Sequence, residues 1–79
     1  MARLFHIVYK VYQVTAKSLD EIDILTRLED DERVDFWSKH RVTNRPMDVM
    51  VSPSAQGEFE TVLTSNRIVY NVIIANFEE

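Results

Sequence analysis

The sequence predicts an α+β fold: an open sandwich in which two helices cover one face of a four-stranded antiparallel sheet. Segments with strand-like and helix-like apolar spacing follow one another in the order β-α-β-β-α-β, the split βαβ or ferredoxin-like arrangement. Right-handed crossovers then place both helices on the same face of the sheet. A length of 79 residues and an apolar content of 46% suit one domain that spans residues 1–79.

The first strand is expected over residues 4–15, where aromatic and β-branched side chains dominate. This run is long for one strand, so its first residues are expected to fray or bend. A helix follows over residues 18–30, with Ser18 as its N-cap and Glu21 placed to complete a capping box. Apolar side chains recur along it at helical spacing: Ile22, Ile24, Leu25 and Leu28.

The second strand is expected over residues 34–42. Because side chains alternate between the faces of a sheet, Val34 and Phe36 share one face and Asp35 and Trp37 share the other. We take the Phe36 face as the one packed against the helices. The run Asn44-Arg45-Pro46 is a turn signal, and the apolar alternation resumes in a third strand over residues 46–51.

A second helix is expected over residues 53–65, capped by Ser52 or Ser54, because Pro53 suits the first turn of a helix. Asn66 is expected to adopt a left-handed conformation at the helix end, and the most apolar strand follows over residues 67–76. The predicted core residues are Leu25, Phe36, Phe59, Val62 and Val72.

Composition narrows the possible functions. The net charge of −4 disfavours nucleic acid as a partner, since binding to phosphates requires a basic face. There is no cysteine, so neither disulfides nor a thiolate metal site support the fold, although this alone does not fix the compartment. No apolar run approaches the roughly 20 residues that span a bilayer, and no signal-peptide pattern is present.

No constellation for catalysis or metal binding is recognisable. The two histidines, His6 and His40, stand at no metal-ligand spacing, and neither belongs to a His-x-x-Glu pair. The serines lack a nucleophile-elbow context, and one glycine cannot form a glycine-rich phosphate loop. The carboxylates between Asp20 and Asp35 are best explained as a solvated helix face. We therefore expect no catalytic residue, no metal ligand and no cofactor.

Four blocks, in this order and at these intervals, resemble the activation segments of the A/B-type zinc metallocarboxypeptidases. The blocks are Tyr9-Lys10-Val11-Tyr12-Gln13-Val14, Leu28-Glu29 followed by Val34-Asp35-Phe36-Trp37, Arg45-Pro46-Met47-Asp48-Val49-Met50-Val51 with Pro53, and Ile68-Val69-Tyr70-Asn71-Val72-Ile73-Ile74-Ala75-Asn76. The resemblance covers nearly the whole chain, from about Tyr9 to Glu79. Two departures stand out: Thr15-Ala16-Lys17 lacks the proline that the family often has there, and Arg67 stands where many members have glycine.

The resemblance implies a function without chemistry of its own. Segments of this family fold as an open sandwich over the active-site funnel of a secreted digestive carboxypeptidase. They exclude the C-terminal end of a peptide substrate while the zinc site stays largely formed, and they assist folding of the enzyme. The implied partners are the catalytic domain, in cis in the zymogen, and a trypsin-like activating protease. The resemblance also implies a signal peptide before this segment and a connecting segment after Glu79.

Two regions are candidates for contact with the enzyme. Trp37 lies on the face opposite the predicted core and would anchor an interface; the alternative is that it packs on strand neighbours or the sheet edge. The second region follows it and is rich in basic groups that could steer docking onto an acidic rim: Ser38, Lys39, His40, Arg41, Thr43, Asn44 and Arg45. Its alternative is a hairpin tip charged for solubility.

The type of partner and the function class have alternatives. B-type segments place an acidic residue in this second region, and none lies between Ser38 and Met47, which favours an A-like or a divergent partner. A ferredoxin-like nucleic-acid-binding module would use exposed aromatics of the sheet, but the net acidity opposes it. An acylphosphatase-like hydrolase would need a phosphate-cradling loop, which the sequence lacks.

Overall fold

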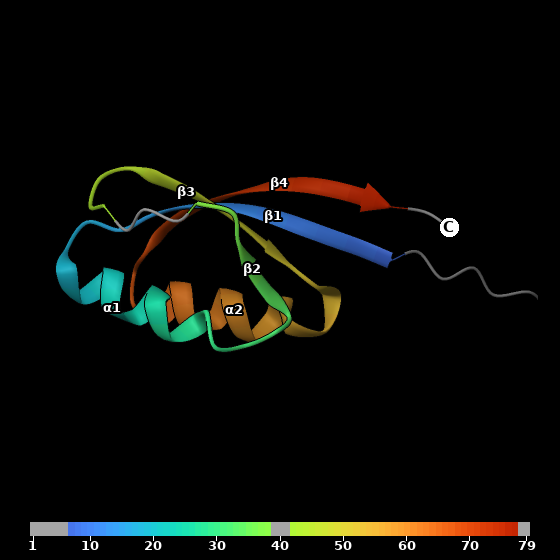
Figure 1. Cartoon of the computed structure of the whole chain (residues 1–79), viewed down its shortest axis with the longest axis horizontal. Helices are drawn as coiled ribbons and strands as arrows, with labels where there is room; N and C mark the ends of the chain where they lie inside the picture. Colours follow the sequence, from blue (N-terminus) through green and yellow to red (C-terminus); the bar gives the residue numbers. More distant parts are fainter. Residues whose placement is uncertain (1–6, 39–41, 78–79) are drawn as a thin grey trace, which may run out of the picture.

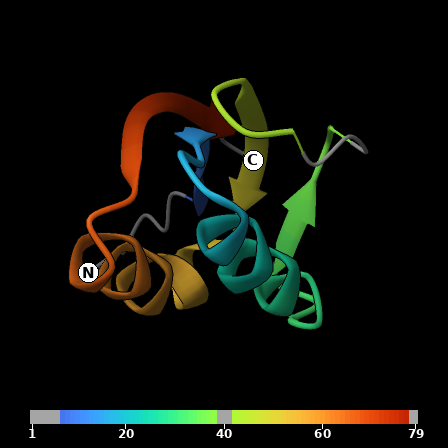
Figure 2. The same ribbon diagram turned by 90° about the vertical axis from the view of Figure 1, so that its left-hand side faces the viewer.

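The computed structural model describes residues 7–38 and 42–77, and it has the predicted α+β open-sandwich architecture (Figure 1). The elements are β1 (Ile7–Thr15), α1 (Leu19–Leu28), β2 (Val34–Phe36), β3 (Pro46–Val51), α2 (Pro53–Ser65) and β4 (Val69–Phe77). The four strands form one antiparallel sheet in the order β2-β3-β1-β4. Both helices lie on the same side of this sheet (Figures 1 and 2).

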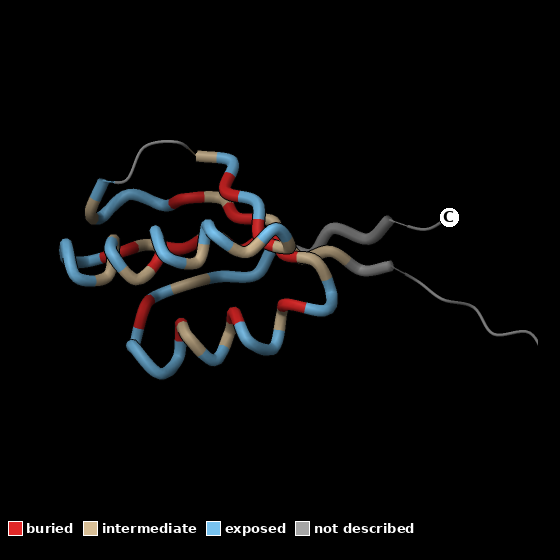
Figure 3. Tube along the Cα trace, turned by 60° about the horizontal axis from the view of Figure 1, so that its bottom comes forward, coloured by how far each residue is buried: buried red, intermediate tan, exposed pale blue. Residues whose placement is uncertain are grey.

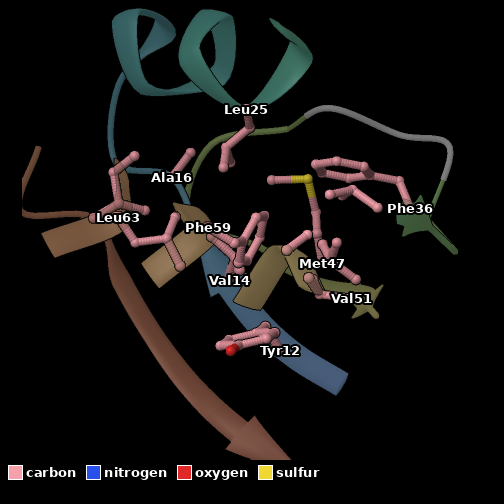
Figure 4. Close-up of a cluster of buried hydrophobic side chains, with 13 residues drawn as sticks. Tyr12, Val14, Ala16, Leu25, Phe36, Met47, Val51, Phe59 and Leu63 are labelled. Carbon is pink, nitrogen blue, oxygen red and sulfur yellow. The ribbon is translucent and has the colours of Figure 1, made fainter. Parts of the chain in front are cut away.

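The core lies between the helices and one face of the sheet. In α2 the buried positions Ala55, Phe59 and Leu63 recur every four residues and so lie along one side of the helix. Figure 3 colours the buried residues of the chain red. The ring of Phe59 packs against that of the fully buried Tyr12 in β1, with 4.9 Å between centroids. Side chains of both helices and of β1, β2 and β3 point into this cluster (Figure 4).

The register decides which face each strand residue occupies. Tyr12 lies opposite Val49 of β3 and Val72 of β4, and Val49 lies opposite Phe36 of β2. Directly paired residues project to the same face of a sheet, so these four residues share the helix-covered face. Phe36 is buried, as the sequence predicted. The residues between them along the strands therefore face away from the helices, on what we call the open face.

Local hydrogen bonds define the start of α1. The Ser18 hydroxyl accepts from the backbone N–H of Glu21 at 3.2 Å, while the Glu21 carboxylate accepts from the backbone N–H of Lys17 at 2.8 Å. This is a capping box in which the returning bond reaches one residue further back than usual. The helix ends at Leu28, two residues before the predicted boundary, and Glu29 and Asp30 form a turn.

The second strand is much shorter than predicted. β2 covers Val34–Phe36, and its pairing with β3 places Phe36 opposite Val49. One further backbone hydrogen bond, from Trp37 to Asp48, follows the strand, but the described residues 37, 38 and 42 are not in a strand. The connection also turns aside, because the backbone N–H of Asn44 donates to the carbonyl of Ala16 at 2.6 Å, beyond the end of β1. The predicted strand over residues 34–42 is therefore confirmed at Val34–Phe36 and wrong at residues 37, 38 and 42, while residues 39–41 lie outside the described residues.

The end of α2 also differs from the prediction. Asn66 has φ −103°, and the left-handed residue is Arg67, with φ 56°. The N–H of Ile68 donates to the carbonyl of Leu63 at 2.8 Å and the N–H of Arg67 to that of Thr64 at 3.1 Å, which is a Schellman motif. Ile68 and Leu63 are both buried in the same core cluster, and β4 begins at Val69 rather than at residue 67.

The predicted core needs two further corrections. Val72 faces the helix side but is 39% exposed, because β4 is the outer strand and the helices do not cover it there. Val62 is only half-buried, since it lines a groove between α1 and α2. Ser52 is the N-cap of α2 and Pro53 its first residue, but the Ser52 side chain makes no capping hydrogen bond. Residues 4–6 of the predicted first strand lie outside the described residues.

Ion pairs and hydrogen bonds link α2 to the sheet and to the α1–β2 connection. The Glu60 carboxylate accepts a hydrogen bond from the Tyr12 hydroxyl and lies 3.3 Å from the Lys10 ammonium. These partners lower the pKa of Glu60, whereas burial and the neighbouring carboxylate raise the pKa of Tyr12. Arg33 pairs with Asp31 at 2.7 Å and with Glu58 at 3.0 Å, and the guanidinium holds the pKa of Asp31 at about 2.

Phe36→Ala should largely unfold the domain. Truncation of a buried aromatic costs about 3–5 kcal/mol, which is a large part of the free energy of unfolding of a chain this small. The measurement is thermal unfolding followed by circular dichroism, with Asp35→Ala on the open face of the same strand as the control. If the Phe36 variant melts within a few degrees of the parent, the assignment of the two faces is wrong.

Arg67→Gly should raise the melting temperature. A non-glycine residue in the left-handed region costs on the order of 1 kcal/mol, which corresponds to about 4–8 °C for a domain of this size. Asn44, with φ 64°, provides the matched control, because asparagine tolerates this region and Asn44→Gly should change little. A lower melting temperature for the Arg67 variant would contradict the strained-cap explanation.

Stability should fall as the pH drops from neutral towards 2, and Glu60→Gln should remove part of that fall. A carboxyl whose pKa is lowered by folding stabilises fully above its ordinary pKa, 4.5 for Glu60, and loses that effect as the pH falls through its folded-state pKa. The measurement is melting temperature against pH, with the exposed Glu32→Gln as a control of equal charge. Identical curves for the parent and the Glu60 variant would show that the Tyr12–Glu60–Lys10 contact does not couple to folding.

Candidate docking surface

The open face of the sheet presents a half-exposed aromatic side chain beside two carboxylates. Trp37 follows β2, and its backbone N–H donates to the carbonyl of Asp48 in β3 at 2.9 Å, so it continues the strand ladder by one residue. Since Phe36 is buried on the helix side, Trp37 and Asp35 project from the open face. The Trp37 side chain is 52% exposed.

The indole of Trp37 is held in place by a side-chain hydrogen bond. Its Nε1–H donates to the Asp35 carboxylate at 3.1 Å. A tryptophan whose polar edge is satisfied by its own strand can present its apolar ring to a partner at a low cost in lost rotamer freedom. Trp37 therefore contacts a neighbour on its own strand and is also exposed. The sequence had left these open as alternatives, packing on strand neighbours or anchoring an interface.

Apolar and polar rows cross the open face in turn. Val11 of β1 lies between Met50 of β3 and Ile73 of β4, and these neighbours leave Val11 only 6% exposed even though no helix covers it. The next row is polar, with Gln13 between Asp48 and Asn71. Among the described strand side chains of this face, Asp35 and Asp48 carry charge and no cation is present, so the face favours a partner with basic or polar groups around an apolar contact.

Only part of the predicted basic segment, Ser38 and residues 43–45, lies within the described residues. The Ser38 hydroxyl accepts a long hydrogen bond, 3.5 Å, from the backbone N–H of Asp48. Thr43 is half-buried, and Asn44 and Arg45 are exposed in the turn that leads into β3. Lys39, His40 and Arg41 lie outside the described residues, so their place relative to Trp37 stays a prediction.

Sequence reasoning did not identify Asp48 as a member of this surface. Its position was readable, since Asp48 stands between the buried residues Met47 and Val49 and must face the other way. Asp48 meets Trp37 because of the register in which β2 pairs with β3, and the sequence alone did not supply that register.

A shallow cleft of about 520 Å³ lies at the other end of β2. It is lined by Tyr9, Glu32, Arg33, Val34, Asp35, Met50 and Ser52. The Arg33 guanidinium in this cleft is paired with Asp31 and Glu58, and the Asp35 carboxylate accepts the hydrogen bond from Trp37. Within residues 7–38 and 42–77 there is no group of His, Asp and Glu side chains that could hold a metal ion, and no helix is long and apolar enough to cross a membrane.

Comparison with known proteins gives a consistent answer. The sequence model of a family described as carboxypeptidase activation peptide matches residues 12–79. Among solved structures, the chain resembles carboxypeptidase A from Helicoverpa armigera, with a TM-score of 0.75 and 31% identity over 86% of this chain and 16% of that one. No curated protein matches the sequence.

A second solved structure shares the fold at lower identity. Thrombin activatable fibrinolysis inhibitor matches with a TM-score of 0.79 and 16% identity over 89% of this chain and 18% of its own. The chain thus spans less than a fifth of either protein. No finding supports the nucleic-acid-binding alternative, and the two carboxylates of the open face would repel a phosphate backbone.

Proposed function

The chain belongs to the carboxypeptidase activation peptide family, and we propose that it is the inhibitory pro-segment of a secreted zinc carboxypeptidase. The observation that carries the proposal is the family match, which spans residues 12–79 and thus every described element except the start of β1. The chain would act without catalytic residues of its own, by covering the active-site cleft of the catalytic domain in cis.

The open face supplies the physical basis for such a cap. Trp37 offers a pre-oriented apolar ring, and tryptophan is among the residues that contribute most to binding at interfaces. Asp35 and Asp48 surround it with negative charge that would pair with basic groups at the rim of the enzyme's cleft. A rigid sheet over the cleft would exclude the C-terminal end of a peptide substrate without touching the zinc ligands.

The turn that precedes β3 would extend this contact. Ser38, Thr43, Asn44 and Arg45 lie beyond Trp37 on the connection between β2 and β3, and Lys39, His40 and Arg41 belong to the same connection in the sequence. An A-type enzyme is the favoured partner, because no acidic residue lies between Ser38 and Met47. The 31% identity to a structure of carboxypeptidase A supports the same choice.

Covalent attachment would make modest affinity sufficient for latency. A segment joined to its enzyme by a short linker meets it at an effective concentration in the millimolar range. Cleavage of the linker by a trypsin-like protease would remove that advantage, and the segment could then dissociate. The same contact would assist folding of the catalytic domain, because a pro-segment that binds the folded enzyme stabilises it by mass action.

The domain added in trans should inhibit an A-type zinc carboxypeptidase, and Trp37→Ala should weaken that inhibition by at least about tenfold, as expected when an interface anchor worth more than 1.4 kcal/mol is lost. The measurement is release of the C-terminal residue from a peptide substrate during titration with the domain. Leu19→Ala is the matched control, because Leu19 is an exposed apolar side chain, 78% accessible, at the start of α1.

Two results would contradict the proposal in different ways. Absence of inhibition of both A-type and B-type enzymes would remove the cap function and leave the fold alone. Inhibition that Trp37→Ala and Leu19→Ala affect equally would keep the function but move the contact away from Trp37. Circular dichroism of both variants distinguishes lost contact from lost folding.

A further inference from the structure

The outer strand β4 lacks the features that usually protect a sheet edge. It ends the strand order, so no described strand lies on its outer side. The nine residues Val69–Phe77 include no charged residue and no proline, in a chain with 28% charged residues. Natural edges are normally blunted by short length, charge, proline or a bulge, because an open row of N–H and C=O groups accepts another strand.

The opposite edge of the same sheet shows those protections. β2 has only three residues, its central residue is Asp35, and the chain leaves the sheet one residue after Phe36. The contrast between the two edges is therefore one of length and charge together, and it singles out β4 as the edge open to pairing.

The exposed apolar side chains of β4 indicate what would cover it. Val69 and Ile73 project from the open face, where they are 49% and 48% exposed, and Val72 projects from the helix side. A partner lying on one face of the sheet would cover only one of these sets. A strand in the plane of the sheet covers both, and it also satisfies the outer backbone groups.

The strand is complementary to a second copy of itself. In an antiparallel pair centred on Asn71, Val69 faces Ile73 of the other copy, Tyr70 faces Val72, and Asn71 faces Asn71. Each exposed apolar residue then meets an apolar residue on the same face of the joined sheet. The paired residues 69–73 carry no charge, and the nearest charged residue, Arg67, would face Ala75 of the other copy rather than another charge.

We propose that two copies of this chain associate through antiparallel β4–β4 pairing centred on Asn71, which joins two four-stranded sheets into one. Pairing about a two-fold axis uses the same residues on both copies and closes at the dimer. One strand pair buries less than a standard stable interface, so the dimer is weak and forms at high protein concentration. This inference does not rest on the proposed function, and its test contains no carboxypeptidase.

The first test is sedimentation equilibrium of the whole chain across a wide range of concentration. The apparent mass should rise from that of the monomer towards twice that value, and Ile73→Lys should abolish the rise, since it places a cation in each half of the paired edge. Val42→Lys is the matched control, because it also replaces an exposed aliphatic side chain, 44% accessible, and makes the same charge change away from β4.

A second test checks the register and does not depend on the Ile73 variant folding. The chain has no cysteine, so Asn71→Cys provides a unique thiol at the proposed two-fold axis. Mild oxidation at high concentration should cross-link it much faster than Thr61→Cys on the exposed side of α2. A chain that stays monomeric, a dimer that survives Ile73→Lys, or equal cross-linking of the two cysteine variants would each overturn the proposal.

Discussion

Packing of Phe59 in α2 against Tyr12 in β1 is the contact on which the rest of the structure depends. β1 is the strand that pairs with both β3 and β4, so fixing the face of Tyr12 fixes the face of every paired residue in those strands. The β3 register passes the constraint on to β2, where it buries Phe36 and turns Asp35 and Trp37 outward. The candidate docking surface is thus a consequence of how the core is packed.

The two faces of the sheet differ in how their side chains are covered. The helix side holds the buried cluster, together with the ion pairs of Lys10 and Arg33 that tie α2 to its surroundings. Among the described residues no second layer covers the open face, so its apolar side chains are shielded by strand neighbours, as Val11 is, or remain partly accessible, as Trp37 and Ile73 are. A chain this short buries only about 60% of the surface its unfolded form exposes. Such a domain gains from a partner that covers the open face.

The fold class and the outward orientation of Trp37 could be predicted because both follow from short-range periodicity. The length of β2 could not, since it depends on the β2–β3 register and on the bond from Asn44 to Ala16. The exposure of Val72 depends on β4 being the outer strand, and the left-handed conformation falls on Arg67 because the Schellman bonds end at Ile68. Asp48 joins the surface through the same register. The length of β2, the exposure of Val72 and the place of Asp48 depend on contacts distant in the sequence, which a local pattern does not contain. The bonds at the end of α2 are local, and there the sequence prediction placed the left-handed residue one position too early.

In the proposed zymogen, the open face at Trp37 meets the catalytic domain of a zinc carboxypeptidase. The most direct measurement is the ¹⁵N–¹H spectrum of the labelled domain as an unlabelled A-type enzyme is added, because the chain has one tryptophan and therefore one indole N–H signal. We expect that signal and the backbone signals of Asp35 and Asp48 to shift or broaden first, while those of exposed α2 residues such as Thr61 stay unchanged. An unperturbed indole signal under conditions in which the enzyme is inhibited would contradict the claim.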